Sequence, residues 1–332
     1  MVKTPCKDIQ PATGIWYGTE QQRRLDWILQ LNQKQKAELE QAVEQVRSRG
    51  IDLDEVTRND FDQPLLAPLL DSVAHELEQG RGFTLIRGLP VEEFSEVELG
   101  IIFWGIGSYL GIGVSQSIAG DRLGHVIDKG STDRYYTAGG PIVFHMDPVD
   151  VVGLLCLRAA RSGGASRIVN ARTVHNILLE EKPDLLEILY NGFYNSRRGH
   201  GESTPSKRVP VYADGSDGLE CYLLPITIHQ AVEEGHPLSD AEQEALSALN
   251  EIAARPGVYL DMEFQPGDIQ FLNNRFILHA RTDYEDDRDP ALKRHLLRLW
   301  LMMPDWSARV KVMDFHNRTD RHGGGVKPGT NS

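Results

Sequence analysis

Short apolar segments separated by glycine, aspartate and proline dominate the middle and the end of this 332-residue chain. Between residues 114 and 157 they read GVSQSIAG, RLGHVID, YYTAGGPIVFHMD and DVVGLLCLR, and the stretch 258–304 adds three or four more. Many short strands bounded by turn residues favour a sandwich or barrel over alternating βαβ units. The sequence therefore predicts a mainly β fold with flanking helices.

Apolar residues at helical spacing mark the flanking segments. They predict an N-terminal helix over 20–50 that stops at Gly50, a second helix over 65–79 and a largely buried one over 94–111. A further helix over 239–254 begins with a capping box, Ser239 and Glu242. We expect a single domain overall, with a helical arm over 1–81 that packs on the core or forms an oligomer contact, a β-rich core over 82–310 with helical and loop insertions, and a tail over 311–332.

The net charge and the length of the apolar segments indicate which classes of binding partner the protein can have. The formal net charge of −13 argues against nucleic acid and against an anionic membrane surface, because both require a concentrated basic surface. No segment approaches the ~18 uninterrupted apolar residues of a membrane span. The three cysteines form no CxxC pair, as is usual in a reducing compartment. The expectation is a cytoplasmic protein with a small-molecule substrate and no membrane or nucleic-acid partner.

The segment Phe144-His145-Met146-Asp147-Pro148 carries the first sign of chemistry. His145 and Asp147 are two residues apart where an apolar run begins, so on an extended strand both side chains leave the same face. His279, at the end of the apolar run DIQFLNNRFILHART, is the best placed of the other histidines to join them. Two imidazoles and one carboxylate on one face of a metal form the facial triad of non-haem Fe(II) oxygenases. Alone, an HxD pair is a weak signal, and a hydrogen-bonded histidine beside a turn aspartate explains it equally well.

Further motifs strengthen the interpretation. The turn Gly163-Gly164-Ala165-Ser166 follows the HxD strand by one strand length, and Arg294 and Arg298 form an i, i+4 pair in KRHLLRLWL. In this order and spacing the motifs resemble those of the TauD/TfdA group, the taurine and 2,4-dichlorophenoxyacetate dioxygenases, and the chain is also similar to clavaminate synthase. The resemblance covers roughly residues 82–304.

The resemblance implies a fold and a set of iron ligands. The group has a double-stranded β-helix, or jelly roll, and its enzymes use Fe(II), 2-oxoglutarate and O₂. By this resemblance His145, Asp147 and His279 match the iron ligands.

The same resemblance implies a site for 2-oxoglutarate. Ser166 stands where the group's GGxT/S residue touches this cosubstrate, and Arg294 and Arg298 match the RxxxR pair that grips its two carboxylates. Arginine suits this task because its planar fork makes paired hydrogen bonds to a carboxylate. The stretch from His279 to Arg294 is about four residues longer than in taurine dioxygenase, which leaves Arg281, Arg288, Arg294 and Arg298 as candidate anchors. We favour Arg294 for the distal carboxylate and Arg298 for the end near the metal.

Residues that would line a substrate pocket are less well marked. Arg197 and Arg198 lie in a long polar loop, where they either pair with an anionic substrate group or are solvated. Three other histidines, His125, His175 and His295, have no partner at ligand spacing, which favours a core or surface role. The full set of candidate substrate residues is Gln116, Ser117, Tyr136, Thr137, Phe144, Arg197 and Arg198.

These observations predict an oxygenase that couples 2-oxoglutarate decarboxylation to oxidation of a small organic substrate, an amino acid or another carboxylate. Hydroxylation is the default, and desaturation or ring closure use the same oxidant. Two alternatives keep the three ligands: a cupin-like metal-binding or sensor protein without turnover, and a Zn(II) hydrolase with a metal-bound water. The arginine pair favours the oxygenase, because a sensor has no need to hold a dicarboxylate.

Overall fold

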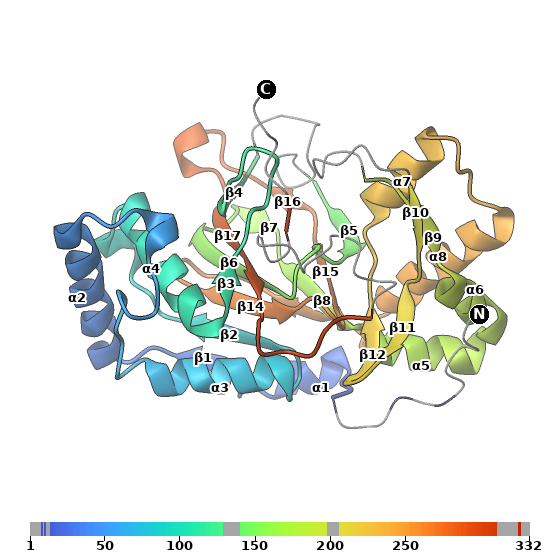
Figure 1. Cartoon of the computed structure of the whole chain (residues 1–332), viewed down its shortest axis with the longest axis horizontal. Coiled ribbons are helices and arrows are strands. Elements are labelled where there is room, and N and C mark those ends of the chain that lie inside the picture. The colour runs from blue at the N-terminus through green and yellow to red at the C-terminus, as the bar shows by residue number, and fades with distance from the viewer. Residues whose placement is uncertain are drawn as a thin grey trace.

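Two β-sheets face each other at the centre of the molecule, with helices gathered at both sides (Figure 1). The computed structural model describes residues 8, 10, 14–128, 140–197, 206–310 and 325–326. The larger sheet has the strand order β1-β2-β14-β6-β17-β3, with β4 also paired to β17, and the smaller sheet has the order β13-β8-β15-β5. The larger sheet consists of β1 (Ile28–Gln30), β2 (Phe83–Arg87), β3 (Ile112–Gly113), β4 (Leu123–Ile127), β6 (Val151–Arg158), β14 (Ile269–Asn273) and β17 (His295–Met302). The smaller sheet consists of β5 (Ile142–His145), β8 (Ser166–Asn170), β13 (Leu260–Met262) and β15 (Ile277–Arg281).

Pairing in both sheets is antiparallel except between β1 and β2. Two facing antiparallel sheets with crossing connections are the jelly-roll arrangement, so the predicted mainly β fold with flanking helices is confirmed. Short two-stranded ladders extend the turns: β7 (Ser162–Gly163) with β16 (Tyr284–Glu285), β9 (Phe193–Asn195) with β10 (Lys207–Val209), and β11 (Tyr212–Gly215) with β12 (Gly218–Cys221).

The helices form two groups, one beside each sheet (Figure 1). Residues of α2 (Gln33–Arg49), α3 (Ala67–Glu78) and α4 (Glu96–Leu110) share a hydrophobic cluster with strands of the larger sheet. Residues of α5 (Ala171–Glu181), α6 (Pro183–Asn191), α7 (Pro225–Glu233) and α8 (Asp240–Ala253) share a second cluster with strands of the smaller sheet. The short α1 (Gly18–Arg23) contacts β13. Helices therefore cover the outer faces, and the space between the sheets is left for a site.

Local sequence signals account for the helix boundaries. Ser239 accepts a hydrogen bond from the backbone of Glu242, whose side chain returns to the Ser239 backbone, so the predicted capping box is confirmed. Asn32 and Gln35 form an equivalent box at the start of α2. That helix ends at Gly50, which has a φ of 64° and so adopts the left-handed conformation that favours glycine.

The predicted helix over 20–50 is only partly correct. Its second half is α2, but Ile28–Gln30 forms β1 and pairs in parallel with β2, with Ile28 opposite Leu85. Trp27 packs edge-on against Phe83, with ring centroids 5.8 Å apart. Burial of this apolar run against the sheet edge outweighs its helical spacing, because tertiary contacts override weak local propensity. The division of the chain at residues 81 and 310 stays a prediction, and most of the proposed tail lies outside the described residues.

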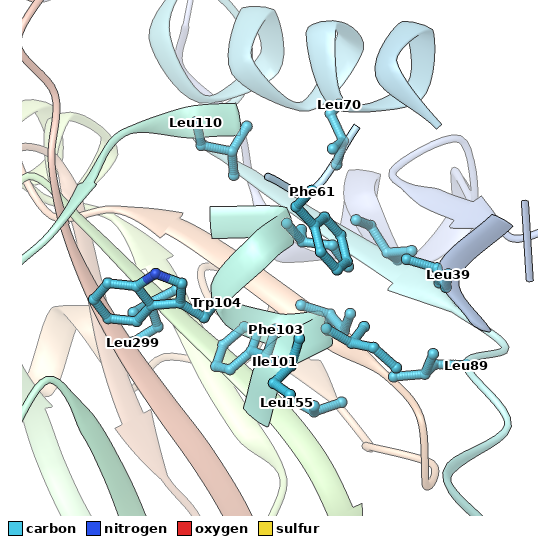
Figure 2. Packing of buried hydrophobic residues seen from close by; sticks show 14 of the residues in the cluster. Leu39, Phe61, Leu70, Leu89, Ile101, Phe103, Trp104, Leu110, Leu155 and Leu299 are labelled. Carbon is cyan, nitrogen blue, oxygen red and sulfur yellow. The ribbon is translucent and has the colours of Figure 1, made fainter. Parts of the chain in front are cut away.

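The helix α4 is the apolar centre of the first group. Ten of its residues are buried, and the indole Nε1 of Trp104 donates to the backbone oxygen of Val56 at 3.0 Å. Figure 2 shows Trp104 and Phe103 among the packed residues of this cluster. Despite this apolar character, neither α4 nor any other helix within the described ranges is both long and apolar enough to cross a membrane.

Replacing Phe61 with alanine is expected to lower the free energy of unfolding by about 3–5 kcal/mol, because a fully buried aromatic ring is removed. Its ring lies directly over Gly105 of α4, where an added Cβ would come within 2.4 Å of it. Neighbouring atoms therefore cannot fill the space without moving the helix. Urea unfolding of both proteins measures the difference. A loss below about 1 kcal/mol would contradict this packing.

Candidate metal centre

Two neighbouring strands of the smaller sheet bring the predicted ligands together. The strands β5 and β15 are antiparallel, and His145 lies directly opposite His279, so both side chains leave the same face. Their ring centroids are 4.2 Å apart. Asp147 follows β5 by two residues, and one ligand atom from each of the three residues lies within 4.8 Å of the others. The structure therefore assembles the His145–Asp147–His279 cluster that the sequence suggests.

Hydrogen bonds orient the cluster. The Nδ1 of His145 donates to the backbone oxygen of Val143 at 2.9 Å, which leaves its Nε2 as the lone-pair nitrogen. The Oδ2 of Asp147 accepts from the indole Nε1 of Trp300 at 3.0 Å. The same oxygen lies 3.9 Å from the Nε2 of His279. Partners outside the cluster thus fix ligand orientation, as they do in many metal sites.

Burial sets the charges of the cluster. It lowers the pKa of His279 to about 3, with a further contribution from nearby His145, and it also lowers the pKa of His145. Burial alone would raise the pKa of Asp147, but the charge of Arg298 and the two imidazoles outweigh it, so this pKa lies below its ordinary value. At neutral pH the cluster consists of two neutral imidazoles and one carboxylate. These protonation states are the ones that metal binding requires, and the donor set fits Fe(II).

The cluster lies in a cavity between the two sheets. Two arginines also line the cavity: Arg294 immediately precedes β17, and Arg298 lies within this strand. The floor and sides are mostly apolar. The complete lining is Val126, Ile142, His145, Asp147, Val152, Leu154, Ser166, Phe264, His279, Ala280, Arg281, Arg294, Leu296 and Arg298.

Arg294 is a buried cation that has no anionic partner for its side chain among the described residues. Its Nη2 donates to the backbone oxygen of Gly164 at 3.4 Å, and its guanidinium carbon lies 5.6 Å from the centroid of the Tyr284 ring. No carboxylate of the described residues lies within ion-pair distance of its guanidinium. Burial and the charge of Arg281 lower the pKa of Arg294 to about 10. A buried charge without a counter-ion is costly, so this position suits an anionic ligand.

Arg298 lies beside the His145–Asp147–His279 cluster, and Gln116 fixes its position through hydrogen bonds. Its Nη1 is 3.7 Å from the Oδ2 of Asp147, and its Nε donates to the Oε1 of Gln116 at 2.7 Å. The Nε2 of Gln116 donates to the backbone oxygen of Arg298 at 2.8 Å. Gln116 was expected to contact substrate, but the structure places it behind Arg298 and not in the cavity wall. Its part is to orient the arginine next to the metal ligands.

Replacing Gln116 with leucine is expected to lower the free energy of unfolding by about 1–3 kcal/mol, because the buried Nε of Arg298 loses the Gln116 oxygen to which it donates. Because the resemblance implies that Arg298 holds 2-oxoglutarate near the metal, loss of its orientation should also raise the KM for this cosubstrate. Ser117→Ala is the matched control. Ser117 is equally buried but donates to Asp121, so its removal should leave this KM unchanged. Equal KM values in both variants would rule out the positioning role.

The remaining candidate anchors occupy different places. Ser166 lines the cavity, and its Oγ donates to the Oε1 of Gln270 at 3.0 Å. Arg281 also lines the cavity, directly across the ladder from Ser166, and donates to the backbone oxygen of Gly140. Arg288 is exposed. The structure thus brings three of the four candidate arginines to the cavity and leaves Arg288 outside it.

The structure does not bring the described candidate substrate residues into the cavity. Phe144 alternates with His145 along β5, so it points to the opposite face and packs in the cluster around α5, α6 and α8. Ser117 bonds within its own loop, and Arg197 is half-buried but does not line the cavity. Tyr136, Thr137 and Arg198 lie outside the described residues.

Trp300, which the sequence interpretation missed, belongs to the site through its bond to Asp147. A signal for it was present. It follows Arg298 by two residues, so on a strand both side chains lie on the same face.

Comparisons with known proteins agree with this geometry. The model of the taurine catabolism dioxygenase TauD, TfdA family matches residues 47–300. The FR-33289 synthase of Streptomyces rubellomurinus is 29% identical over 307 residues, which are 88% of this chain and 90% of the relative. Among solved structures, asparagine oxygenase in complex with Fe(II), 3-hydroxyasparagine and succinate has a TM-score of 0.67 at 16% identity and covers 83% of this chain and 93% of its own. The non-haem iron oxygenase OrfP in complex with Fe and alpha-ketoglutaric acid has a TM-score of 0.61 at 13% identity, covering 82% and 93%.

At these identities the two solved structures show a shared fold. The family match covers more of the chain, since it includes α3 to α8 and both sheets except β1 and the last two residues of β17. It also contains His145, Asp147 and His279, together with Arg294 and Arg298. The chain therefore belongs to the taurine catabolism dioxygenase TauD, TfdA family.

Proposed function

We propose that this dioxygenase couples the oxidative decarboxylation of 2-oxoglutarate to the oxidation of a small organic substrate, an amino acid or another carboxylate. Succinate and CO₂ are the coproducts. The observation that carries the proposal is the shared cavity, in which the buried guanidinium of Arg294, which has no carboxylate partner in the described part of the chain, lines the same space as a His–Asp–His cluster.

His145, Asp147 and His279 are the residues that would hold Fe(II). When bound, the ion supplies open coordination positions for the 2-oxo acid and for O₂. Trp300 keeps Asp147 in place through the Oδ2 oxygen, and the positive charge of Arg298 keeps this carboxylate ionised. These contacts hold the ligand set ready before the cosubstrate arrives.

Arg294 is the proposed partner of the distal carboxylate of 2-oxoglutarate. A dicarboxylate that meets the His145–Asp147–His279 cluster at one end needs a cation at the other, and Arg294 supplies it from a buried position in the cavity lining. Ser166 offers a hydroxyl from the adjacent strand β8. Apolar lining residues such as Leu154 and Leu296 limit the entry of water to the reacting groups.

The substrate class and the setting are part of the proposal. Solved relatives of the same fold were crystallised with hydroxylated asparagine or arginine, which supports a small amino acid. Hydroxylation is the proposed outcome, with desaturation and ring closure as variants. Halogenation is disfavoured because Asp147 occupies the ligand position that a halide would need. A cytoplasmic location suits the buried thiols Cys156 and Cys221. The proposed assembly is a homo-oligomer that binds neither nucleic acid nor membrane.

Two other functions would use the same ligands, and Arg294 weighs against both. A sensor without turnover and a Zn(II) hydrolase need no cation aimed at a second carboxylate. Incubation of the full-length protein with Fe(II), ascorbate, 2-oxoglutarate and a panel of amino and organic acids tests the proposal. We expect succinate formation that one class of substrate stimulates. Absence of 2-oxoglutarate consumption with Fe(II), together with ester or amide hydrolysis by Zn(II)-loaded protein, would favour the hydrolase.

A further inference from the structure

A second group of side chains that can bind a metal ion lies on the outer face of β17, the face turned away from the cavity. Arg294, just before β17, and Leu296 and Arg298 within it line the cavity, whereas Leu297 packs in the cluster that contains α4. His295 shares this outer face because strand side chains alternate. There it meets His125 of β4 and Glu96, the first residue of α4. The two imidazoles lacked a visible partner in the sequence, and pairing of β4 with β17 brings them together.

The three side chains have the spacing of a metal site. The Nδ1 of His125 lies 2.9 Å from the Nε2 of His295 and 3.6 Å from the Oε1 of Glu96. The Oε2 of Glu96 lies 3.7 Å from the Nδ1 of His295. Ligands around a tetrahedral Zn²⁺ with bonds of about 2.0–2.1 Å are roughly 3.4 Å apart. Small rotations of the exposed Glu96 and His125 side chains therefore suffice to surround an ion.

We propose that Glu96, His125 and His295 bind a second divalent cation, of the class that prefers imidazole, such as Zn²⁺. Buried His295 fixes one ligand, and the exposed His125 and Glu96 give the ion access from solvent. Two imidazoles, one carboxylate and a water complete four-coordination. The ion joins the N-terminus of α4 to β4 and β17, on the reverse side of the strand that carries Arg294 and Arg298.

Neighbouring charge limits the affinity of this second site. The Nη2 of Arg158 lies 3.3 Å from the Nδ1 of His295. A bound ion also replaces the proton that the two rings share. An imidazole that binds a metal ion normally donates its other N–H to an oxygen acceptor. The guanidinium of Arg158 has only donor groups, so it cannot accept this hydrogen bond from His295. The second site therefore binds more weakly than the cavity cluster, and Arg158→Gln, which supplies an amide oxygen, is expected to strengthen binding.

A Co²⁺ titration of a variant that lacks two of the three ligands in the cavity tests this proposal. The protein is the full chain without an affinity tag, carrying His145→Ala and His279→Ala, and Co²⁺ binding is followed by visible absorption and calorimetry. We expect one equivalent to bind with a four-coordinate spectrum. Adding His125→Ala should weaken binding at least 10-fold, since the ion loses one of three protein ligands. His229→Ala, at an exposed position of α7, is the matched control and should change nothing.

Three outcomes decide the matter. Loss of binding with His125→Ala and tighter binding with Arg158→Gln support the site. Absence of Co²⁺ binding in the double variant overturns it, as does binding that both His125→Ala and Glu96→Gln leave unchanged. Because the cavity ligands are already removed, the result is independent of the proposed oxygenase function.

Discussion

Alanine at position 279 is expected to abolish 2-oxoglutarate turnover in the full-length protein, with a loss of well over 100-fold in kcat/KM at limiting Fe(II). His279 is one of three ligand residues that converge in the cavity. Changes to groups that merely orient ligands already cost about 10–100-fold in metal affinity or activity, and removal of a ligand costs more. Succinate release at several Fe(II) concentrations measures the effect.

His75→Ala is the control for this variant. His75 is exposed on α3 and does not line the cavity, so its removal should leave turnover intact. Circular dichroism and thermal unfolding of the metal-free proteins establish that the His279 variant is folded. Turnover above one tenth of the unmodified rate in a folded His279→Ala protein would exclude this residue as a ligand.

The second large effect concerns Arg294, whose replacement is expected to weaken 2-oxoglutarate binding but to stabilise the metal-free protein. Arg294→Met should weaken 2-oxoglutarate binding by about 2–5 kcal/mol, or roughly 30- to 4,000-fold, because a desolvated carboxylate loses its cation. The same substitution should raise the free energy of unfolding of the metal-free protein by on the order of 1 kcal/mol, because it removes a buried charge that has no carboxylate partner within the described ranges. Calorimetric titration and urea unfolding measure the two quantities.

Arg294→Lys is the matched variant for this prediction. It keeps the positive charge but loses the planar fork, so its 2-oxoglutarate affinity should fall between those of the unmodified protein and Arg294→Met. A merely structural arginine would give the reverse pattern. In that case Arg294→Met would lower stability and leave 2-oxoglutarate affinity unchanged.

The fold and the metal cluster could be predicted because their signals are local or periodic. The alternation of short strands and turns indicates the sheets, and His145 and Asp147 lie two residues apart on an extended segment. His279 ends its own apolar run, and antiparallel pairing of β5 with β15 places it directly opposite His145. Each of these relations follows from strand geometry.

Other features depend on contacts between distant segments and could not be predicted. Helical spacing over residues 25–30 gives no indication that the edge of the larger sheet accepts β1. Gln116 is separated by more than 180 residues from Arg298, and only pairing along β17 shows that they meet. The choice among the arginines is open in the sequence because the stretch from His279 to Arg294 is longer than in taurine dioxygenase. Burial distinguishes Arg294 from exposed Arg288, and the assignment of the anchor stays a prediction.

The central claim is that one cavity holds a metal ion on three side chains and a dicarboxylate between that ion and Arg294. Anomalous diffraction from crystals of the protein grown with Mn(II) and 2-oxoglutarate under anaerobic conditions tests it most directly. We predict one Mn peak in the cavity, bound by His145, Asp147 and His279, with the distal carboxylate of 2-oxoglutarate on the Arg294 guanidinium. A cavity without Mn, or 2-oxoglutarate bound with its distal carboxylate away from Arg294, would contradict the account.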